Sequence, residues 1–568
     1  ILTALQIHFN TPPSSILSVE DGVEQARWLP GARLNIAESC FRGRRADVPA
    51  LIWRREGDET LGRMTIDALH QRSRTVAGAL AALGHKPGQA FAIDMPMTVE
   101  SVVIYLGIVL FGGVVVSIAD SFAPAEIATR IRISDTVLIF TQDVIVRGER
   151  RLPLYSRVLA ADGPRAVVLP AEATLSVQLR EGDVSWTTFL SQGRSALLSP
   201  HISDASATTN ILFSSGTTGD PKAIPWTQVT PIKAAADAFA HHDVQPGDVV
   251  AWPTNLGWMM GPWLIYASLL NGATIALYQG APTGRGFCTF VQDAKVNVLG
   301  VVPSIVRAWR ATDATQGLDW SSVRTFSSTG EVSNPDDMLW LMSRAGYSPI
   351  IEYCGGTELG GGYIAGSRMQ PQAPSTFSSP TMGCAFTILS GDGAATDDGE
   401  IALIPPILGS SQRLLNRDHH QVYFANMPTG PHEQPLRRHG DQIRHIGGGY
   451  YRALGRVDDT MNLGGIKTSS AEIERACETV AGLHDVAAIA VPPPGGGPER
   501  LVLVAVAEPG RELDAEAVRL QAQQAIRAAL NPLFKVAAVR FVDALPRTAS
   551  NKVMRRILRR DVMATGEG

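Results

Sequence analysis

Unbroken apolar runs recur along the N-terminal part of the chain, separated by segments long enough to form helices. They lie at residues 91–95, 114–118, 137–140, 210–213, 274–278 and 298–302. Runs without polar alternation are typical of parallel strands that are covered on both faces. Residues 91–118 have the order strand, Pro-bearing turn, helix, Gly-Gly stop and Val-rich strand, which is a βαβ unit. The pattern therefore predicts an α/β body with more than one sheet layer.

A different pattern begins after about residue 458. Helices are expected at 470–480 and 513–530, and strands at 486–491 and 501–506 flank a Pro/Gly-rich hairpin loop at 492–497. This arrangement predicts a separate α+β domain of ordinary size. We therefore expect two domains, residues 1–457 and residues 458–568.

The composition is that of a globular protein. Of the 568 residues, 45% are hydrophobic and 18% are charged, which excludes a disordered chain. There are 50 Lys and Arg against 54 Asp and Glu, and a net charge of −4 gives no reason to expect nucleic acid or an anionic membrane as a partner. Residues 102–118 are too short and too rich in glycine to span a bilayer, so we expect a buried helix that leads into a buried strand there.

The cysteine and histidine patterns indicate neither a disulfide framework nor a protein-bound transition metal. The five cysteines never form a C-x-x-C pair, and the twelve histidines show no H-E-x-x-H spacing. We expect a reducing intracellular compartment, either cytoplasm or peroxisome. The last residues, Gly566, Glu567 and Gly568, differ from the S-K-L peroxisomal signal. The sequence leaves the oligomeric state and whatever precedes Ile1 open.

A loop rich in hydroxyls and glycines follows the apolar run at 210–213. It reads Ser214, Ser215, Gly216, Thr217, Thr218 and Gly219, and Lys222 follows. Glycines let backbone N–H groups turn toward an anion, hydroxyls add neutral donors, and the lysine balances charge, as a polyphosphate requires. The G-x-x-x-x-G-K-[ST] pattern cannot be aligned to it. The alternative is an ordinary surface turn, but its length and its position after a strand favour a phosphate loop.

Residues 213–223 resemble the phosphate loop of the adenylate-forming superfamily, which contains acyl-CoA synthetases, carrier-protein adenylation domains and firefly luciferase. The superfamily pattern is Tyr-Thr-Ser-Gly-Thr-Thr-Gly-x-Pro-Lys-Gly, here with Phe213, Ser214 and Ala223 as substitutions. Other superfamily motifs follow in order. The resemblance implies a large αβαβα-type N-terminal domain that binds AMP and the acyl group, and a small mobile α+β C-terminal lid with its hinge at Asp458.

The resemblance also implies a nucleotide site. In Tyr353-Cys354-Gly355-Gly356-Thr357-Glu358 the threonine would meet the α-phosphate and the glutamate would hold Mg²⁺, a cation that takes few protein carboxylates. In isolation, most of these residues would be read as ordinary turns or surface pairs. The remaining implied nucleotide contacts are Gly330, Glu331 and Val332 along the adenine, Asp441 on the ribose, Arg456, and Lys467, which stands where acetyl-CoA synthetases have an arginine.

Residues 545–556 resemble the motif that carries the catalytic lysine of adenylation. That lysine maps to Lys552, which would contact the carboxylate and the α-phosphate. An ammonium group placed there stabilises the negative charge that develops as the acid attacks phosphorus.

Free CoA is the expected acceptor. Residues 27–35 resemble the opening of acetyl-CoA synthetase-like enzymes, and Arg147, Arg150 and Arg527 match arginines that this branch presents to CoA. Gly465 would line the passage for the pantetheine thiol. Each arginine alone would be read as a solvated surface charge, whereas the three together favour CoA.

The acid is expected to be larger than acetate. Acetyl-CoA synthetases close the acyl pocket with a Trp two residues before the Thr-Glu pair, and this chain has Gly355 there. Methionines adapt to varied apolar shapes, so a medium-chain or bulky hydrophobic acid is expected, as in fatty acid metabolism. The expected pocket residues are Trp258, Met259, Met260, Thr329 and Gly355. The alternative is that other core side chains fill this space.

The sequence thus predicts a ligase similar to plant-type acyl-activating enzymes related to acetyl-CoA synthetase. It would use ATP, Mg²⁺ and CoA to convert a carboxylic acid to acyl-AMP and then to acyl-CoA. Two alternatives remain: an adenylation domain that loads a carrier protein, and a noncatalytic homologue that binds nucleotide or acyl groups. Loss of Lys552, Glu358 or Asp441 would indicate the noncatalytic homologue, and all three are present. The identity of the acid stays open.

Overall fold

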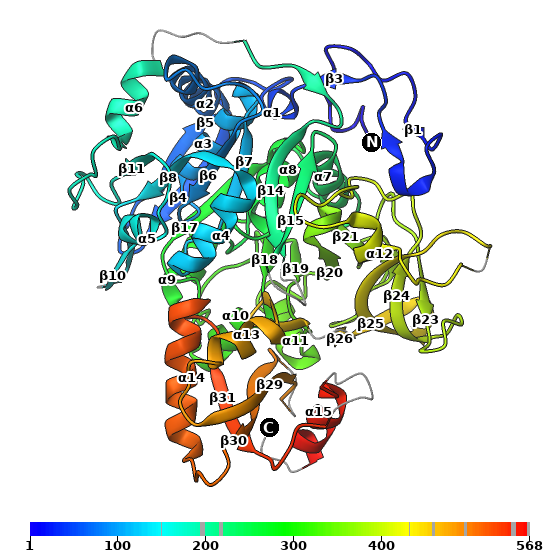
Figure 1. Cartoon of the computed structure of the whole chain (residues 1–568). Coiled ribbons are helices and arrows are strands. Elements are labelled where there is room, and N and C mark those ends of the chain that lie inside the picture. The colour runs from blue at the N-terminus through cyan, green and yellow to red at the C-terminus, as the bar shows by residue number, and fades with distance from the viewer. Residues whose placement is uncertain are drawn as a thin grey trace.

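Two large sheets form the N-terminal part of the protein in the computed structural model (Figure 1). The structure describes residues 1–148, 150–193, 199–214, 220–430, 432–456, 460–493, 497–546 and 553–564. The seven-stranded sheet is parallel except for its last strand. Its order is β12 (Val184–Ser185), β11 (Ala166–Leu169), β8 (Thr136–Gln142), β6 (Ala90–Asp94), β7 (Val114–Ile118), β14 (Thr208–Ser214) and β15 (Lys222–Thr227).

The nine-stranded sheet is parallel in its centre and antiparallel at both edges. Its order is β22 (Ser379–Pro380), β21 (Gly361–Ala365), β20 (Ile350–Gly356), β19 (Thr325–Ser328), β18 (Val298–Val301), β16 (Val249–Ala251), β17 (Thr274–Gln279), β4 (Pro49–Arg55) and β5 (Gly62–Thr65). All six strands expected from apolar runs are present within a few residues, in these two sheets.

Helices fill the space between the two sheets. Phe91 and Ile93 of β6 and Ile275 of β17 share one buried core with the helices that lie between the sheets. This middle layer contains α2 (Ile66–Ala82), α3 (Val99–Phe111), α7 (Thr230–Ala240) and α8 (Met260–Leu269). Helix α3 is almost wholly buried, as the sequence predicts for this stretch. Among the described helices, none is long and apolar enough to cross a membrane.

The opposite faces of the sheets carry further helices. Ala90 and Ala92 of β6 pack with α4 (Pro124–Ser134) and α5 (Tyr155–Ala160), while Ala276 of β17 packs with α9 (Arg285–Asp293), α10 (Pro303–Ala311) and α11 (Pro335–Ser343). Strands buried on both faces explain the unbroken apolar runs in the sequence. The layers are thus helix, sheet, helix, sheet, helix, which confirms the expected αβαβα architecture.

A smaller antiparallel sheet completes the N-terminal part. Its strands are β23 (Phe386–Leu389), β24 (Asp398–Leu403), β25 (Arg437–Gly447) and β26 (Tyr450–Arg456). The remaining short elements are β1 (Leu17–Ser18), η1 (Val23–Gln25), β2 (Arg27–Trp28), β3 (Arg33–Leu34), α1 (Ile36–Ser39), β9 (Val144–Arg147), β10 (Arg150–Pro153), α6 (Trp186–Gly193), β13 (Ser203–Asp204), η2 (Thr357–Leu359) and α12 (His419–Tyr423).

The C-terminal domain has a three-stranded sheet with helices on both faces (Figure 1). Ala488 and Ala490 face α13 and α14, whereas Ile489 and Val491 face α15. Its elements are β27 (Thr460–Leu463), β28 (Ile466–Ser469), α13 (Ser470–Cys477), β29 (Leu483–Val491), β30 (Arg500–Ala507), α14 (Ala515–Ala529), β31 (Val536–Phe541) and α15 (Arg555–Ala564). A large N-terminal domain and a small α+β C-terminal domain are therefore both present, as expected.

Candidate active site

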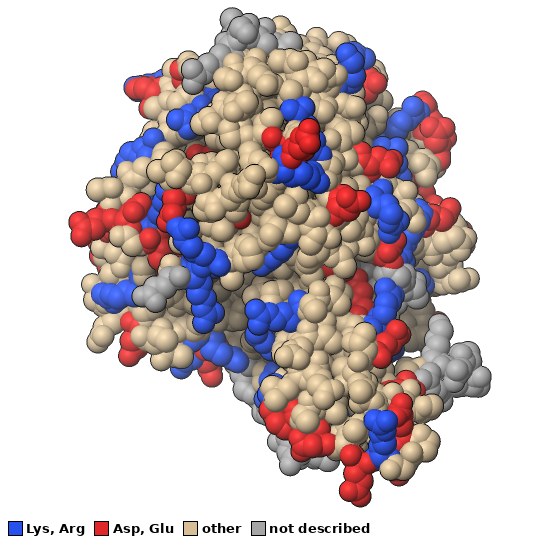
Figure 2. Space-filling model, turned by 60° about the vertical axis from the view of Figure 1, so that its left-hand side comes forward, with Lys and Arg blue, Asp and Glu red and all other residues tan. Residues whose placement is uncertain are grey.

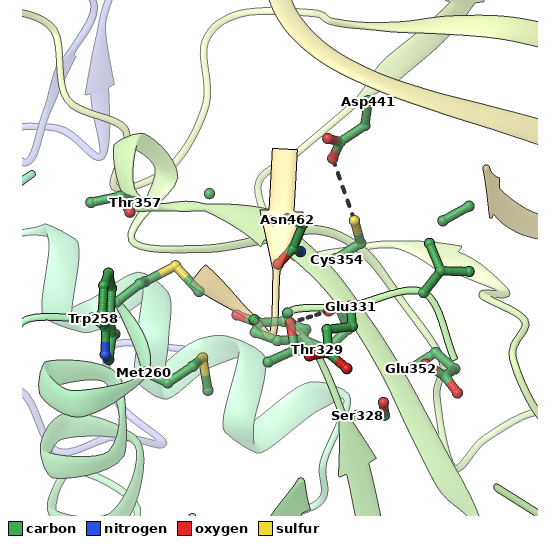
Figure 3. A pocket seen from close by; sticks show the side chains of 18 of the residues that line it. Trp258, Met260, Ser328, Thr329, Glu331, Glu352, Cys354, Thr357, Asp441 and Asn462 are labelled. Atoms are coloured by element: carbon green, nitrogen blue, oxygen red, sulfur yellow. Dashed lines mark hydrogen bonds between the residues drawn. The ribbon is translucent and has the colours of Figure 1, made fainter. Parts of the chain in front are cut away.

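A cavity of about 200 Å³ lies where the C-terminal ends of β14, β19 and β20 meet β25 and the β27–β28 hairpin (Figure 3). Its wall unites segments that are far apart in the sequence. Twelve of the residues predicted from the sequence line it, namely Ser214, Trp258, Met259, Met260, Thr329, Gly330, Glu331, Val332, Gly355, Thr357, Asp441 and Gly465.

One end of the cavity is apolar. Trp258 and Met260 lie on the same side of it in Figure 3, just before or at the start of α8, and Met259 and Phe213 also line the wall. The Trp258 ring packs edge to face on Phe122, with centroids 5.4 Å apart. The mainly aliphatic and aromatic wall, with a thioether on two of its side chains, suits an alkyl chain.

Gly355 is a glycine because a neighbouring strand approaches it closely. A Cβ at this position would lie 2.0 Å from the carbonyl oxygen of Gly361 on β21. The β20–β21 register shifts between Cys354 and Gly355, which brings the two backbones together. An indole could not be added here without moving β21. The space beside Gly355 is therefore set by the strand pairing as well as by the missing side chain.

The other end of the cavity is polar. Asp441 on β25 accepts hydrogen bonds from the Tyr363 hydroxyl at 3.0 Å and the Cys354 thiol at 3.4 Å, and its Oδ2 lies 3.2 Å from His439 Nε2. Burial and the charge of Asp441 raise the pKa of Tyr363 well above its usual range, so the phenol remains a donor. A carboxylate held in this way can accept hydrogen bonds from a diol.

Thr357 and Glu358 occupy the short η2 helix directly after β20. The Thr357 carbonyl accepts a hydrogen bond from Trp226 Nε1 at 2.7 Å, which fixes the turn. A Cβ on Gly356 would lie 2.9 Å from Glu358 Oε2 and 3.1 Å from His439 Cε1, so the carboxylate and the imidazole converge over Gly356. Glu358 is only 8% exposed, and its hard oxygen donors fit Mg²⁺.

Besides Glu499, two further carboxyl groups line the cavity with pKa values that burial raises. Burial raises the pKa of Glu331 to about 7, against hydrogen bonds from the Ser304 N–H and hydroxyl that favour the carboxylate. Burial likewise raises the pKa of Glu352 to about 7, although Ser333 Oγ donates to it at 2.7 Å. Both groups titrate near neutral pH, where general acid or base chemistry is most effective.

The C-terminal domain contributes part of the wall. Gly465, in the turn between β27 and β28, has φ +81°, and its Cα lies 3.6 Å from the position of a Cβ on Gly330. Asn462 on β27 and Glu499 before β30 also line the cavity. The hairpin turn therefore projects into the site.

Known proteins with related sequences identify the family. The family model described as AMP-binding enzyme matches residues 39–404, and the model described as AMP-binding enzyme C-terminal domain matches residues 472–552. The chain belongs to the AMP-binding enzyme family.

Relatives of known name include two plant proteins. Probable acyl-activating enzyme 17, peroxisomal, of Arabidopsis thaliana is 53% identical over 585 residues, covering 100% of this chain and 81% of that protein. Hexanoyl-CoA synthase of Cannabis sativa is 51% identical over 578 residues, covering 98% and 80% respectively. The structure of acetoacetyl-CoA synthetase from Streptomyces lividans matches with a TM-score of 0.74 and 26% identity, over 99% of this chain and 87% of that one. The protein is an AMP-forming acyl-CoA synthetase, with ATP, Mg²⁺ and CoA as co-substrates or cofactors.

Some residues predicted for the synthetase lie outside the cavity or outside the described residues. Lys222 begins β15, and its Cα is the register partner of Ser214, so the described ends of the predicted phosphate loop are paired. Arg456 is the register partner of Asp441, and Lys467 that of Asn462. Residues outside the described ranges are Ser215, Gly216, Thr217, Thr218, Gly219, Asp458 and Lys552.

The three arginines predicted for CoA lie on the side of the synthetase where the two domains meet. Arg147 and Arg150 are register partners in the β9–β10 hairpin, and Arg147 Nη2 lies 3.4 Å from Asp120 Oδ2. Arg527 is in the last turn of α14. Figure 2 shows Lys and Arg side chains on both sides of this junction.

The loop after β7 links the β9–β10 hairpin, which carries Arg147, to the chain after α14, the helix that carries Arg527. Asn531, just after α14, donates to Ser121 Oγ at 3.3 Å, next to the aspartate that pairs with Arg147. A second, small cavity lies between α4, Asn531 and Ile466, and it shares Trp258 and Phe213 with the main cavity.

Sequence reasoning missed several cavity residues. Glu352 and Cys354 stand within the Thr-Glu motif region, so their positions on the strand before it were a usable signal. The contributions of Tyr363, Phe377 and Glu499 depend on tertiary contacts, and no local pattern marks them.

Proposed function

We propose that this synthetase activates a medium-chain or bulky hydrophobic acid rather than acetate. The observation that carries the proposal is the apolar end of the cavity, formed by Phe213, Trp258, Met259 and Met260 beside Gly355. The name of the Cannabis sativa relative, hexanoyl-CoA synthase, supports a chain of this size. Thr329, whose hydroxyl donates to the Tyr353 carbonyl at 2.5 Å, lies at the boundary between the apolar and polar ends.

In the first half-reaction, the polar end would hold ATP. Asp441 would accept hydrogen bonds from the ribose hydroxyls, and Thr357 would contact the α-phosphate. Mg²⁺, held by Glu358, would neutralise phosphate charge. The phosphate loop of Ser214, Ser215, Gly216, Thr217, Thr218, Gly219 and Lys222 would bind the triphosphate, with Gly330, Glu331 and Val332 along the adenine and Arg456 and Lys467 as further contacts.

Lys552 would stabilise the charge that forms when the acid attacks the α-phosphorus. Holding acid and ATP in line removes an entropic barrier of about 7–11 kcal/mol in well-oriented systems. Both nucleophiles of the reaction belong to substrates, so the protein supplies binding, orientation and charge.

In the second half-reaction, Arg147, Arg150 and Arg527 would bind the phosphates of CoA, and the thiol would pass Gly465. The small cavity at the domain junction supports this path, because Trp258 and Phe213 form walls of both cavities. We further propose domains of 1–457 and 458–568 with the hinge at Asp458, so that the C-terminal domain turns between the two steps. For the compartment, the name of the Arabidopsis thaliana relative, probable acyl-activating enzyme 17, peroxisomal, favours the peroxisome.

The decisive experiment is ATP–pyrophosphate exchange with acids of increasing chain length, followed by CoA addition. We expect exchange to be strongest with acids larger than acetate and to fall by about 100-fold or more in Lys552→Ala, because a transition-state charge contact is lost. Exchange limited to acetate would contradict the acid proposal. Undiminished exchange in Lys552→Ala would contradict the role of the lysine.

The acceptor is tested with the same enzyme. Wild-type adenylate is offered either free CoA or a carrier domain bearing phosphopantetheine, and transfer to CoA is expected to dominate. Substitution of Arg147 and Arg150 by Ala should raise the KM for CoA without changing exchange, since these side chains contact only the second substrate. Preferred transfer to the carrier domain would contradict the choice of CoA.

A further inference from the structure

Glu331 has a carboxylate oxygen beside the turn that the C-terminal domain places in the cavity. Its Oε1 lies 3.9 Å from the position of a Cβ on Gly465, and Val302 flanks the same point at 3.2 Å. Its two oxygens each accept one hydrogen bond from Ser304, at 2.9 Å from the N–H and 3.0 Å from the hydroxyl. A carboxylate has about four acceptor positions, so further lone pairs remain available.

The second half-reaction requires a proton acceptor. The thiolate is the nucleophile, and a thiol of ordinary pKa near 8.5 is only a few per cent ionised at neutral pH. A base within reach of the thiol as it attacks would remove this limit. Glu331 is the carboxyl group of the cavity wall that lies beside Gly465.

We propose that Glu331 accepts the thiol proton of CoA as the sulfur attacks the acyl carbon. The S–H bond breaks, the C–S bond forms, and the acyl C–O bond to the phosphate breaks with its electron pair leaving on AMP. Glu331 then releases the proton to solvent. This inference rests on the proposed passage of the thiol past Gly465.

The surroundings of Glu331 favour this role over other carboxyl groups in the cavity. Burial raises the pKa of Glu352 and Glu499 as well, so position decides. Glu352 is bonded to Ser333, and Glu499 accepts a hydrogen bond from the Asn462 N–H at 3.2 Å, whereas the carboxylate oxygen within 4 Å of a Cβ on Gly465 belongs to Glu331. The pKa of Glu331 near 7 results from burial, and Ser304 and the charge of Arg307 oppose the shift. The remaining ionisable side chains on the described cavity wall are Tyr353, Cys354 and Asp441.

Glu331 also has a structural role that the test must separate. Ser304 is in the first turn of α10, so the carboxylate caps that helix. Glu331→Gln keeps an oxygen acceptor for the Ser304 N–H but removes the base. The exposed Glu516 on α14, paired with Arg519 at 2.6 Å, offers Glu516→Gln as a matched control.

The experiment separates the two half-reactions. Enzyme-bound acyl-adenylate is formed from ATP and the best acid of the panel with pyrophosphatase present, then mixed with CoA, and acyl-CoA is followed in a single turnover. In Glu331→Gln, thioester formation at neutral pH should fall by about 100-fold or more, whereas ATP–pyrophosphate exchange, which reports the contact of this side chain along the adenine, should fall far less. Glu516→Gln should match wild type in both assays.

The pH dependence gives a second readout. The wild-type rate of thioester formation should rise as pH passes the Glu331 pKa of about 7. Glu331→Gln should lack this rise and recover only as solution thiolate increases, so its deficit shrinks above about pH 8.5. Ser304→Ala removes a hydrogen bond that favours the carboxylate, so the rise should move to higher pH.

Three outcomes overturn the inference. If Glu331→Gln forms thioester at the wild-type rate, this inference is overturned and the proposed function stands. An equal loss in both half-reactions overturns it as well, because the residue would then act in nucleotide binding or as a helix cap. Transfer of wild-type adenylate to a carrier domain instead of CoA overturns the proposed acceptor together with this inference.

Discussion

At the residue scale, burial affects the carboxyl groups of this protein differently according to the donors that surround them. For Glu331 and Glu352, hydrogen bonds from serine hydroxyls partly offset the cost of burying a carboxylate. Asp94, on β6, has both carboxyl oxygens buried without a hydrogen-bond partner in the described part of the chain. Burial and the nearby charge of Asp120 raise the pKa of Asp94 well above its usual range, although Arg157 opposes this. Asp94 is therefore protonated in the folded protein over a range where the unfolded chain is ionised.

This difference predicts how Asp94→Asn affects stability with pH. Above the ordinary pKa of about 3.9, the folded state binds one more proton than the unfolded state, so wild-type stability falls as pH rises, by at most about 1.4 kcal/mol per pH unit. Asparagine stays neutral at every pH, so Asp94→Asn removes this pH-dependent loss of stability. The gain in melting temperature of Asp94→Asn over wild type should therefore grow as the pH rises above about 5, until Asp94 ionises in the folded protein.

Thermal unfolding at several pH values checks this prediction. Asp162→Asn is the control, because Asp162 is exposed and its φ of 50° suits asparagine. Its effect should be small throughout the pH range. A pH-independent difference between Asp94→Asn and wild type would mean that Asp94 does not hold a proton in the folded state.

At the element scale, the strands that the sequence predicts well are those buried on both faces. The predicted strand 114–118 is β7 (Val114–Ile118), and each of its residues is buried. The antiparallel strands around Asp441 are different, because β25 (Arg437–Gly447) is largely polar and has little apolar periodicity. Its pairing with β24 and β26 depends on contacts distant in sequence. Motifs could therefore predict Asp441, whereas its hydrogen bonds with Tyr363 and Cys354 needed the structure.

The β27–β28 turn allows a test with adjacent glycines. Gly464 and Gly465 have φ values of 64° and 81°, so alanine at either position costs about 1 kcal/mol of backbone strain. A Cβ on Gly464 meets nothing within 4 Å, whereas a Cβ on Gly465 lies 3.2 Å from Val302 and 3.9 Å from Glu331 Oε1 in the cavity wall. Gly465→Ala should therefore slow thioester formation more than Gly464→Ala, with little change in exchange.

Single-turnover transfer to CoA compares the two variants directly. Since both variants carry the same backbone strain, the ratio of their transfer rates reports the contact of the Gly465 side with the cavity. Equal rates would show that the Gly465 side of the turn does not border the thiol path.

At the scale of the whole molecule, two of the places where the domains meet bear on the proposed mechanism. The β27–β28 turn approaches Gly330, and the chain after α14 contacts the loop after β7, where the Ala123 N–H donates to the Leu530 carbonyl at 3.1 Å. This arrangement places Gly465 at the cavity, which suits the second half-reaction. If Lys552 acts in the first half-reaction, the C-terminal domain has to adopt another orientation for adenylation.

Locking the contact after α14 tests this alternation. Asn531 Nδ2 donates to Ser121 Oγ at 3.3 Å, so the double substitution Ser121→Cys and Asn531→Cys places two thiols on side chains that face each other, and oxidation is used to join them. The oxidised protein should still convert added acyl-AMP and CoA to thioester, because Gly465 stays at the cavity. Its ATP–pyrophosphate exchange should fall about tenfold or more, since the orientation needed for adenylation is no longer populated.

Reduction of the disulfide should restore exchange, and each single cysteine variant, treated with the same oxidant, should keep it. These controls matter because the chain has five cysteines of its own, of which Cys354 lies in the cavity. Intact mass measurement confirms that the bond has formed. If the oxidised double variant exchanged at the rate of its reduced form, one domain orientation would serve both half-reactions and the proposed hinge motion at Asp458 would be wrong.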